Sequence, residues 1–401
     1  MVNGVDSMPQ PLANIRVIDA TSAISGPYCS MLLGDMGAEV IKIEEPREGD
    51  LLRKSGPFVG GESTYFLYGN RNKRGMTLNL QESAGRDILL KLVKGADVLV
   101  ENFRPKVKSK LRIDYPVLSG INPRLIYCSI SGFGQTGPWA ETPGFDQIAQ
   151  GMSGLMSVTG FPETGPTRVG VAIGDSICAV FAAYGILGAL LEREKSGKGQ
   201  FIETSLLEAL IAVLGFQAAK YFGTGEAPLP QGNDHASLAP YGTYKTLDGH
   251  INIAAGTSRM WEELCRQLGV ERLLKDERFI SNPNRVANKE ELRRILESRL
   301  ITEKTGHWVE SLGKAGIACG PIYTLSQVFH DPQVLNQKML LETEHLTAGK
   351  ISLIGFPVKL SRTPCSISLP PPTLGQHTEQ ILKELDFSKE EIRAFREKRI
   401  I

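Results

Sequence analysis

Residues 15–44 read IRVIDATSAISGPYCSMLLGDMGAEVIKIE, and this stretch decides the fold. It begins with an apolar run rich in β-branched residues, 15–20, which predicts a strand. Gly26-Pro27 then opens a predicted helix, 27–36, because proline is favoured at the first helical position. A second apolar run, 39–44, predicts another strand. A strand, a helix and a strand in this order favour two parallel strands with a helix packed across them.

The same alternation continues along the chain. Apolar residues at helical spacing predict a helix over 82–94, and two further apolar runs, 97–100 and 125–130, predict strands. A long apolar helix is predicted over 176–194, followed by a strand and another apolar helix that runs to about residue 221. The first half of the chain is therefore expected to form a parallel sheet covered by helices, an α/β fold.

A change of composition marks the predicted domain boundaries. The segment 223–240 is rich in Gly, Pro, Asn and His, and a predicted hairpin (241–253) and helices follow it. Short apolar runs such as 351–354 then resume before a last charged helix. We expect a large domain over residues 1–222, a small domain over 223–333, and a C-terminal segment, 334–401, that returns to the large domain.

Composition excludes several classes of function. Lys plus Arg number 45 and Asp plus Glu 44, so the net charge of +1 argues against nucleic-acid binding. The longest apolar run, 179–191, is shorter than the roughly 20 residues of a membrane span, so no membrane association is expected. Residues 1–10 lack the features of a signal peptide. With six cysteines expected to be buried free thiols, the chain is predicted to be cytoplasmic.

One motif matches the pattern of a dinucleotide site, but the residues that follow it argue against such a site. Gly132 to Gly137 is a literal G-x-G-x-x-G after a predicted strand, but Pro138 and Pro143 follow at once and prevent the helix that a dinucleotide site needs. We therefore expect a glycine-rich loop over a ligand and no nicotinamide cofactor. The six histidines show no metal-ligand spacing, so no metal site is expected, and no G-x-S-x-G serine hydrolase motif occurs.

The pair Gly174-Asp175 is the strongest candidate for chemistry. It stands between a short stretch of small apolar residues and the long apolar helix. The structural interpretation is an N-cap, since Asp accepts a backbone N–H there. The functional interpretation is a nucleophile: a carboxylate at a helix N-terminus stays ionised, and in a dry cleft it can attack an acyl group.

Several sequence blocks bear on the choice between these two interpretations, and they extend in order from Pro11 to about Leu385. They are GAEVIKIE (37–44), NRNKR (70–74), DVLVENFRP (97–105), GFGQTGP (132–138), MSGLM (152–156), Gly174-Asp175, CGP (319–321), DPQ (331–333) and LGQHT (374–378). In these blocks the chain resembles the class III CoA-transferases, the CaiB-BaiF family that includes formyl-CoA transferase. The resemblance makes Asp175 the expected nucleophile.

The resemblance also implies a fold and a reaction. The fold would be a Rossmann-like parallel-sheet large domain plus a smaller α+β domain, in an interlocked homodimer. The reaction would move CoA from an acyl-CoA to a carboxylic acid, with a small dicarboxylate such as succinate or oxalate as the family-based expectation. Asp175 would form a mixed anhydride and then an aspartyl-CoA thioester. Coenzyme A would be a substrate, and the partners would be the acyl-CoA, the acid and a second copy of the chain.

By family position, thirteen residues besides Asp175 are expected to bind CoA or lie beside it. They are Ile24, Ser25, Leu78, Asn79, Leu80, Gln81, Asn102, Phe103, Arg104, Lys110, Gly144, Phe145 and Asp146. Gly134, Gln135 and His235 are weaker candidates for contact with the acid. The glycine-rich loop and the Gly60-Gly61 turn are candidate lids that exclude water.

The chain departs from the family pattern at two places, and both changes affect basic residues. Arg104-Pro105-Lys106 replaces the usual Pro-Gly, and Pro143 stands where formyl-CoA transferase has a lysine. Phosphate contacts could then come from Lys106, Lys108 or Lys110. Lys73 and Arg74 either bind phosphate or belong to a solvated face.

Two other functions remain open at this point. An acyl-CoA racemase of the same fold needs a base on each face of the substrate, and those enzymes carry a Gly-His-Asp block where this chain has Gly144-Phe145-Asp146. A non-catalytic CoA-binding subunit is the second alternative, and the presence of Asp175 argues against it.

Overall fold

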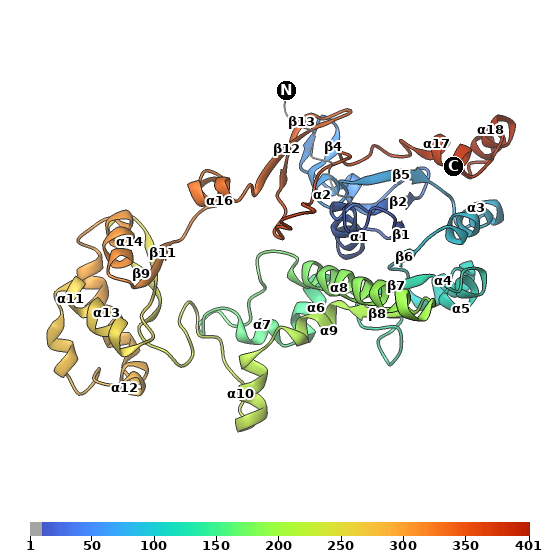
Figure 1. The fold of residues 1–401 in the computed structure, drawn as a ribbon. Helices are drawn as coiled ribbons and strands as arrows, with labels where there is room; N and C mark the ends of the chain where they lie inside the picture. The colour runs from blue at the N-terminus through green and yellow to red at the C-terminus, as the bar shows by residue number, and fades with distance from the viewer. Residues whose placement is uncertain (1–9) are drawn as a thin grey trace. The chain divides into compact units, whose positions relative to one another are not determined.

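The computed structural model describes residues 10–401, so residues 1–9, on which the expectation of no signal peptide rests, lie outside it. The chain divides into two compact units (Figure 1). The first holds the described residues up to Leu155 together with Val169–Gly215 and Pro332–Ile401. The second holds Met156–Arg168 and Phe216–Asp331.

A six-stranded sheet forms the centre of the first unit. Its order is β5-β2-β1-β6-β7-β8, and every neighbouring pair is parallel, which confirms the predicted α/β fold. The strands are β1 (Arg16–Ala20), β2 (Glu39–Glu44), β5 (Lys73–Thr77), β6 (Val98–Glu101), β7 (Ile126–Ser131) and β8 (Phe201–Ser205). Strand β5 was not predicted, because its first two residues, Lys73 and Arg74, are charged.

Alternate residues of each strand point to opposite faces of the sheet and build two apolar cores. Val17, Val98 and Val100 face one core, and Ile18 and Leu99 face the other. Because helices cover both faces, the strands are apolar on both sides, as parallel strands usually are.

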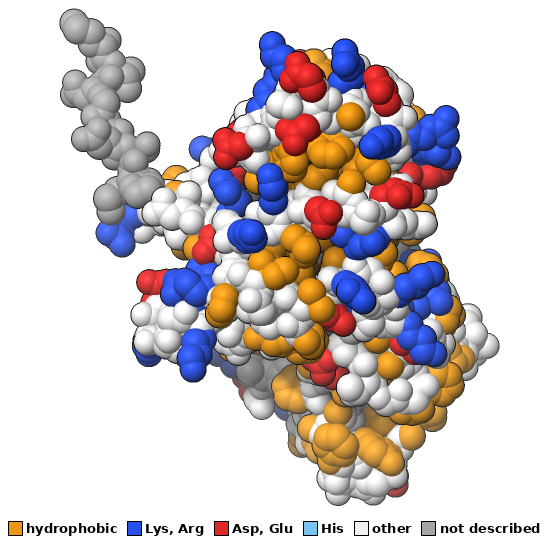
Figure 2. Space-filling model, turned by 90° about the vertical axis from the view of Figure 1, so that its right-hand side faces the viewer, with side chains coloured by type: hydrophobic (Ala, Val, Ile, Leu, Met, Phe, Trp, Pro, Cys, Tyr) orange, Lys and Arg blue, Asp and Glu red, His pale blue; other side chains and the backbone are white. Residues whose placement is uncertain are grey.

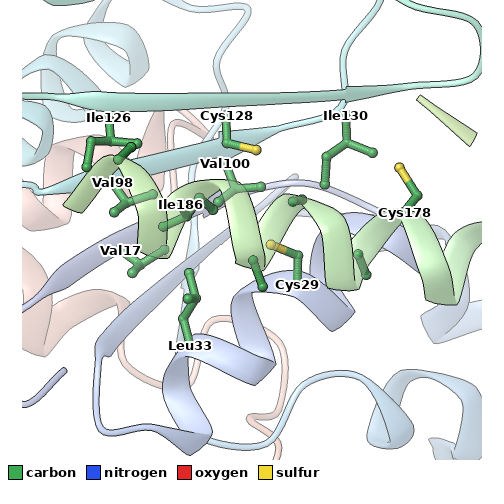
Figure 3. Packing of buried hydrophobic residues seen from close by; sticks show 14 of the residues in the cluster. Val17, Cys29, Leu33, Val98, Val100, Ile126, Cys128, Ile130, Cys178 and Ile186 are labelled. Atoms are coloured by element: carbon green, nitrogen blue, oxygen red, sulfur yellow. The ribbon is translucent and has the colours of Figure 1, made fainter. Parts of the chain in front are cut away.

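Helices α1 (Ser25–Asp35) and α8 (Ile173–Ser196) cover the first face, with α6 (Asp146–Met152) and α9 (Leu206–Ala212). Figure 3 shows Ile186 of α8 beside Val17 and Val98, with Cys29 and Leu33 of α1 in the same cluster. Helix α8 is long and apolar enough to cross a membrane, but its buried residues pack in this core.

Helices α3 (Ser83–Lys94), α5 (Tyr115–Ile121), α17 (Thr378–Glu384) and α18 (Lys389–Glu397) cover the second face. The smaller elements of this unit are η1 (Leu51–Lys54), β3 (Phe58–Val59), β4 (Glu62–Ser63), α2 (Thr64–Tyr68) and α4 (Pro105–Leu111). The Gly60-Gly61 turn joins β3 to β4 and lies against Thr347 and Ala348, and neither glycine lines the large cavity described below.

The C-terminal segment packs against the outer edge of the sheet. After α16 (Pro332–Asn336) and the hairpin β12 (Leu340–His345) and β13 (Gly349–Ile354), an extended stretch lies beside β5. The N–H of Asn72 donates to Leu369 O (2.8 Å), and that of Thr77 donates to Thr378 Oγ1 (2.9 Å). Residues far apart in the sequence are thereby joined in one unit.

The second unit is a small α+β structure. Its antiparallel sheet has the order β11-β10-β9, formed by β9 (Tyr241–Lys245), β10 (His250–Ala254) and β11 (Ala318–Pro321). The predicted hairpin is β9–β10. The helices are α10 (Phe216–Thr224), α11 (Ser258–Leu268), η2 (Glu271–Lys275), α12 (Asn282–Ala287), α13 (Lys289–Leu300), α14 (Thr305–Lys314) and α15 (Leu325–Val328), and the short α7 (Leu155–Val158) spans the boundary between the units.

The surface charges agree with expectation, and the thiols do so only in part. On the face shown in Figure 2, Lys and Arg side chains are interspersed with Asp and Glu, as the near-zero net charge suggests. All six cysteines are free, but Cys319 and Cys365 are partly exposed, so the expectation of six buried thiols is wrong for these two.

Candidate active site

A cavity of about 1240 Å³ lies in the first unit at the carboxyl edge of the sheet. The loops that follow β1, β2, β5, β6 and β7 and the start of α9 after β8 all contribute to its lining, because parallel strands end at the same edge. Pockets for drug-sized ligands are usually about 300–1,000 Å³. The cavity is therefore suited to a large, extended ligand.

The cavity includes the point where the strand order reverses, between β1 and β6. Open α/β sheets bind ligands at this point, because the two adjacent loops leave in opposite directions. Here the loops are tied together by Asn102. Its Oδ1 accepts the N–H of Ser22 (3.1 Å), and its Nδ2 donates to Ser22 O (2.8 Å).

Asp175 lines the cavity as the third residue of α8. It is not the N-cap, since the helix begins at Ile173 and Ala172 precedes it, so the structural interpretation of the sequence is wrong. The position is still in the first helical turn, where the helix dipole favours a negative charge.

The glycine of the Gly174-Asp175 pair has a packing reason. Asp146 Oδ1 accepts the N–H of Gly174 (2.8 Å), and a Cβ at Gly174 would lie 2.9 Å from that oxygen. Asp146 Oδ2 accepts from Gln150 Nε2 (2.7 Å). A second buried carboxylate is thus fixed beside the first turn of α8.

The pKa of Asp175 is raised to about 6, chiefly by burial and to a lesser extent by the charge of Asp146. Hydrogen bonds from the hydroxyl and the backbone of Ser25 oppose this rise by favouring the ionised form. Ser25 is the first residue of α1. Asp175 therefore lies in the first turn of one helix and is bonded by the first residue of another, and it is ionised at neutral pH.

Four basic residues line the same cavity: Arg86, Arg104, Lys106 and Lys110. Lys106 and Lys110 are four residues apart on α4 and so lie on one face of that helix. Positive groups of this kind suit the phosphates of a nucleotide-containing ligand.

Lys108 was expected as a possible phosphate contact, and the structure contradicts this. It lies on α4 between Lys106 and Lys110, two positions from each, and its side chain faces the protein interior. Its Nζ contacts Glu101 Oε1 (2.8 Å), Ser129 Oγ (2.9 Å) and Gln135 Oε1 (2.6 Å). The ammonium group is therefore surrounded by one carboxylate and two neutral oxygen acceptors, and it is not available to a ligand.

Lys73 and Arg74 do not line the cavity either. Lys73 is fully buried and donates to Asp19 Oδ2 (2.9 Å), so it belongs neither to a solvated face nor to a phosphate site. Burial lowers its pKa to about 8 although Asp19 opposes this. Arg74 bonds Glu39 (2.6 Å) and Glu384 (2.7 Å) at the outer edge of the sheet.

Thirteen of the seventeen site residues expected from the sequence line this one cavity. They are Ile24, Ser25, Leu78, Asn79, Leu80, Gln81, Asn102, Phe103, Arg104, Lys110, Gly144, Phe145 and Asp175. Asp146 is not a lining residue, but it bonds Gly174, the neighbour of Asp175. Gly134 and Gln135 are not among the lining residues.

His235 lies in the second unit. Its ring stacks on that of Tyr241, with 4.9 Å between the centroids, and its Nδ1 accepts the N–H of Ser237 (3.1 Å). Within residues 10–401 no group of three or more His, Cys, Asp or Glu side chains is arranged to hold a metal ion.

Sequence reasoning missed Arg86 and the segment after β2. Arg86 is the fourth residue of α3, and its Nη1 donates to Gln81 O (2.7 Å). Its place in the first turn of a helix that follows a parallel strand could have revealed it, since such turns meet the carboxyl edge. Asp50, Leu51 and Leu52, which also line the cavity, carry no comparable signal.

Comparison with known proteins gives consistent findings. The model of CoA-transferase family III matches residues 12–378. A mouse protein named succinyl-CoA:glutarate CoA-transferase is 42% identical over 95% of this chain and 87% of its own length. An acetyl-CoA:oxalate CoA-transferase of Acetobacter aceti is 41% identical over 88% of this chain and 89% of its own. A solved CaiB/BaiF family structure from Brucella suis superposes with a TM-score of 0.86, at 38% identity, covering 94% of this chain and all of that one.

Proposed function

Because the chain belongs to CoA-transferase family III, an enzyme family that transfers CoA between an acyl-CoA and a carboxylic acid, we propose that Asp175 is its nucleophile. The observation that carries the proposal is a single cavity in which Asp175 shares the lining with four basic side chains. A carboxylate can attack a thioester there, while the cations hold the phosphates of CoA.

The first half of the reaction loads CoA onto the enzyme. A carboxylate oxygen of Asp175 attacks the thioester carbon of the donor, the C–S bond breaks, and CoA leaves as a thiolate. The product on the enzyme is a mixed anhydride. The thiolate then attacks the Asp175 carbonyl, which forms an aspartyl-CoA thioester and releases the donor acid as a carboxylate.

The second half repeats these steps in reverse with the acceptor. The acceptor carboxylate attacks the aspartyl thioester, a new anhydride forms, and CoA leaves again as a thiolate. Attack of this thiolate on the acceptor carbonyl gives the new acyl-CoA and regenerates the Asp175 carboxylate. No proton has to be transferred, so the residue must only be ionised, which a pKa of about 6 allows at neutral pH.

The substrates proposed are an acyl-CoA donor such as succinyl-CoA and a small dicarboxylate acceptor. Support comes from the names of the relatives, which specify succinyl-CoA with glutarate and acetyl-CoA with oxalate. Incubation of the purified protein with acyl-CoA donors and mono- and dicarboxylate acceptors, followed by chromatography, would identify the pair. Transfer to monocarboxylates alone would contradict the dicarboxylate proposal.

The role of Asp175 is tested by trapping. Wild-type protein incubated with acyl-CoA and then hydroxylamine should carry a hydroxamate at Asp175, found by mass spectrometry of its peptides. Asp175→Asn and Asp175→Ala should lose transfer while they still bind CoA. Substantial transfer by the Asn variant would show that another group is the nucleophile.

A racemase reaction gains no support from the cavity. The residue at the position of the racemase histidine is Phe145, which lines the cavity and has no titratable group. We expect no deuterium at the α-carbon of a 2-methylacyl-CoA in heavy water above the uncatalysed level. Rapid deuterium exchange at the α-carbon that disappears in Asp175→Ala would show that the protein is a racemase and not a transferase.

A further inference from the structure

The loop that follows β1 is held by an unusual number of side chains. Asp19 Oδ1 accepts the N–H of Thr21 (3.0 Å), and Lys42 Nζ donates to Thr21 O (3.0 Å). Asn102 bonds both the N–H and the carbonyl of Ser22. Asp50 Oδ1 accepts the N–H of Ala23 (3.1 Å). Together these bonds fix five successive backbone groups, from the N–H of Thr21 to the N–H of Ala23.

Ala23 explains why the loop needs such restraint. Its φ is 69°, a left-handed conformation that a residue with a Cβ rarely adopts. Conformations of this kind persist only where the surroundings impose them, and they cluster at functional sites. Two residues later the chain enters α1 at Ser25, the residue that hydrogen-bonds Asp175.

Asp50 is positioned for this task by a buried ion pair. Only 3% of Asp50 is exposed, and its Oδ2 lies 2.9 Å from the Nζ of the fully buried Lys42. Lys42 is also the residue that holds Thr21 O. The Lys42–Asp50 pair therefore holds Thr21 and Ala23, while Asn102, directly after β6, holds Ser22.

Stability alone does not explain the arrangement. Two carboxylates (Asp19 and Asp50) and two ammonium groups (Lys42 and Lys73) are buried together, so the cluster is neutral. Buried ion pairs lose hydration, and apolar residues of similar volume are often equally stabilising. What an apolar replacement could not do is hold the N–H of Ala23 and the carbonyl of Thr21 in place.

We propose that Asp50 and Asn102 are positioning residues that fix the loop after β1 so that Ser25 meets the nucleophile Asp175. The inference rests on the proposed role of Asp175 and extends it to residues outside the reacting group. Neither residue transfers CoA; each acts through the backbone of the loop, from Ser22 and Ala23 to Ser25.

The test measures the rate of hydroxamate formation at Asp175 as a function of pH, at saturating acyl-CoA. Ser25 favours the ionised form of Asp175, so its displacement should raise the pKa of that carboxyl and move the acidic limb of the profile to higher pH. For Asp50→Ala we expect a shift of about 0.5–1 pH unit upward. The rate at pH 7 should fall by about 10- to 100-fold, the usual cost of a misplaced reacting group.

Two further variants make the result specific. Asp50→Asn keeps an oxygen for the Ala23 N–H but places an amide NH2 against Lys42 instead of a carboxylate oxygen, so it should move the limb less than Asp50→Ala does. Asn102→Ala releases the loop from its other side, at a partly exposed residue, and should shift the limb in the same direction even if Asp50→Ala does not fold. Asp146 and Cys178, the other titratable groups that interact with Asp175, are unchanged in all of them.

Asp35 supplies the matched control. It is also 3% exposed and ion-paired, to Arg71 Nη2 at 2.6 Å, but it lies at the far end of α1. Asp35→Ala should lower the melting temperature about as much as Asp50→Ala and leave the acidic limb where it is. An equal shift in both variants would show a general loss of rigidity and overturn the proposal.

A double-mutant cycle completes the test. If Asp50 acts through Ser25, Ser25→Ala alone should move the limb upward, and Asp50→Ala should add little to it. Independent, additive shifts would refute the inference, as would an unmoved limb in folded Asp50→Ala and Asn102→Ala. If wild-type protein forms no hydroxamate at Asp175, the proposed function itself has failed, and the two failures are thereby distinguished.

Discussion

At the scale of single residues, Asp175 is a carboxylate kept in an environment that disfavours its charge. Its pKa is raised to about 6 in the folded protein, mainly by burial, so the folded state binds a proton that the unfolded chain has already released. Stability is therefore lost as the pH rises from the ordinary value of 3.8 through about 6. Function and stability are opposed at this residue.

This opposition predicts that Asp175→Asn is more stable than the wild type above pH 6. At pH 8 the gain in the free energy of unfolding should be about 1–3 kcal/mol. The lower values apply if solvent reaches the side chain in part. Near pH 4 the gain should largely disappear, since the wild-type residue is then protonated in the folded state. Thermal or urea unfolding at both pH values measures it, and a variant less stable than wild type at pH 8 would contradict the expectation.

Asp146 should set the pH dependence of transfer. Its charge helps to raise the pKa of Asp175, so Asp146→Asn should lower that pKa and move the acidic limb of kcat/KM to lower pH. An asparagine oxygen can still accept the N–H of Gly174, which keeps the start of α8 in place. Asp87→Asn, an exposed change on α3, serves as the control and should leave the limb unmoved.

At the scale of elements, two chain segments touch where they line the cavity. A Cβ on Gly144, just before α6, would lie 2.5 Å from Gly132 Cα, just after β7. Both positions must therefore be glycine, because the two backbones leave no room for a methyl group.

Gly144→Ala should force these segments apart. We expect a loss of about 1–3 kcal/mol in stability, the usual result of overpacking, and weaker CoA binding because both segments line the cavity. Gly120→Ala, in open space within α5, should instead stabilise by up to about 1 kcal/mol. Calorimetric titration with CoA and thermal unfolding separate the two effects, and normal CoA affinity in Gly144→Ala would argue against this site.

The junction of β6 and α4 depends on the buried Lys108–Glu101 pair. Glu101 is fully buried, so Lys108→Met should leave an uncompensated charge and cost about 3–5 kcal/mol. The double variant Lys108→Met/Glu101→Gln should regain most of this loss. Lys110→Met should instead weaken CoA binding with little change in stability, because Lys110 lines the cavity. Equal losses of affinity from Lys108 and Lys110 would show that both contact the ligand.

At the scale of the whole molecule, both units expose large apolar side chains. Tyr184 and Leu191 on α8 are 75% and 68% exposed, and Phe216 and Phe222 on α10 are 92% and 82% exposed. Exposed aromatic and aliphatic groups in such number mark surfaces that another chain covers. We propose that the partner is a second copy, in the interlocked homodimer implied by the family resemblance.

An interlocked dimer has no easily separated folded monomer. Mass photometry after dilution to nanomolar concentration should therefore still show only the dimer. Charged substitutions at Phe216 and Phe222 should lower the yield of folded protein instead of producing a stable monomer. A reversible monomer–dimer equilibrium in the wild type would refute interlocking.

The sequence alone determined the α/β fold, most of its strands and the candidate nucleophile. Val17, Val98 and Leu99 belong to short apolar runs whose spacing is a local property, and local spacing is visible in one dimension. The loops that line the cavity were also within reach, because parallel strands end at a common edge and so bring their following residues together.

Only the tertiary structure decided which charged residues are buried and what they hold. Lys73 and Lys108 have the sequence character of surface residues, yet each is buried against a carboxylate from a different element: Asp19 of β1, 54 positions away, and Glu101 of β6, seven positions away. Asp50 and Asp146 likewise act on residues 27 and 28 positions distant. A charged side chain can be buried only where a partner of opposite charge is present. The fold determines which residue becomes that partner, and no local sequence pattern shows it.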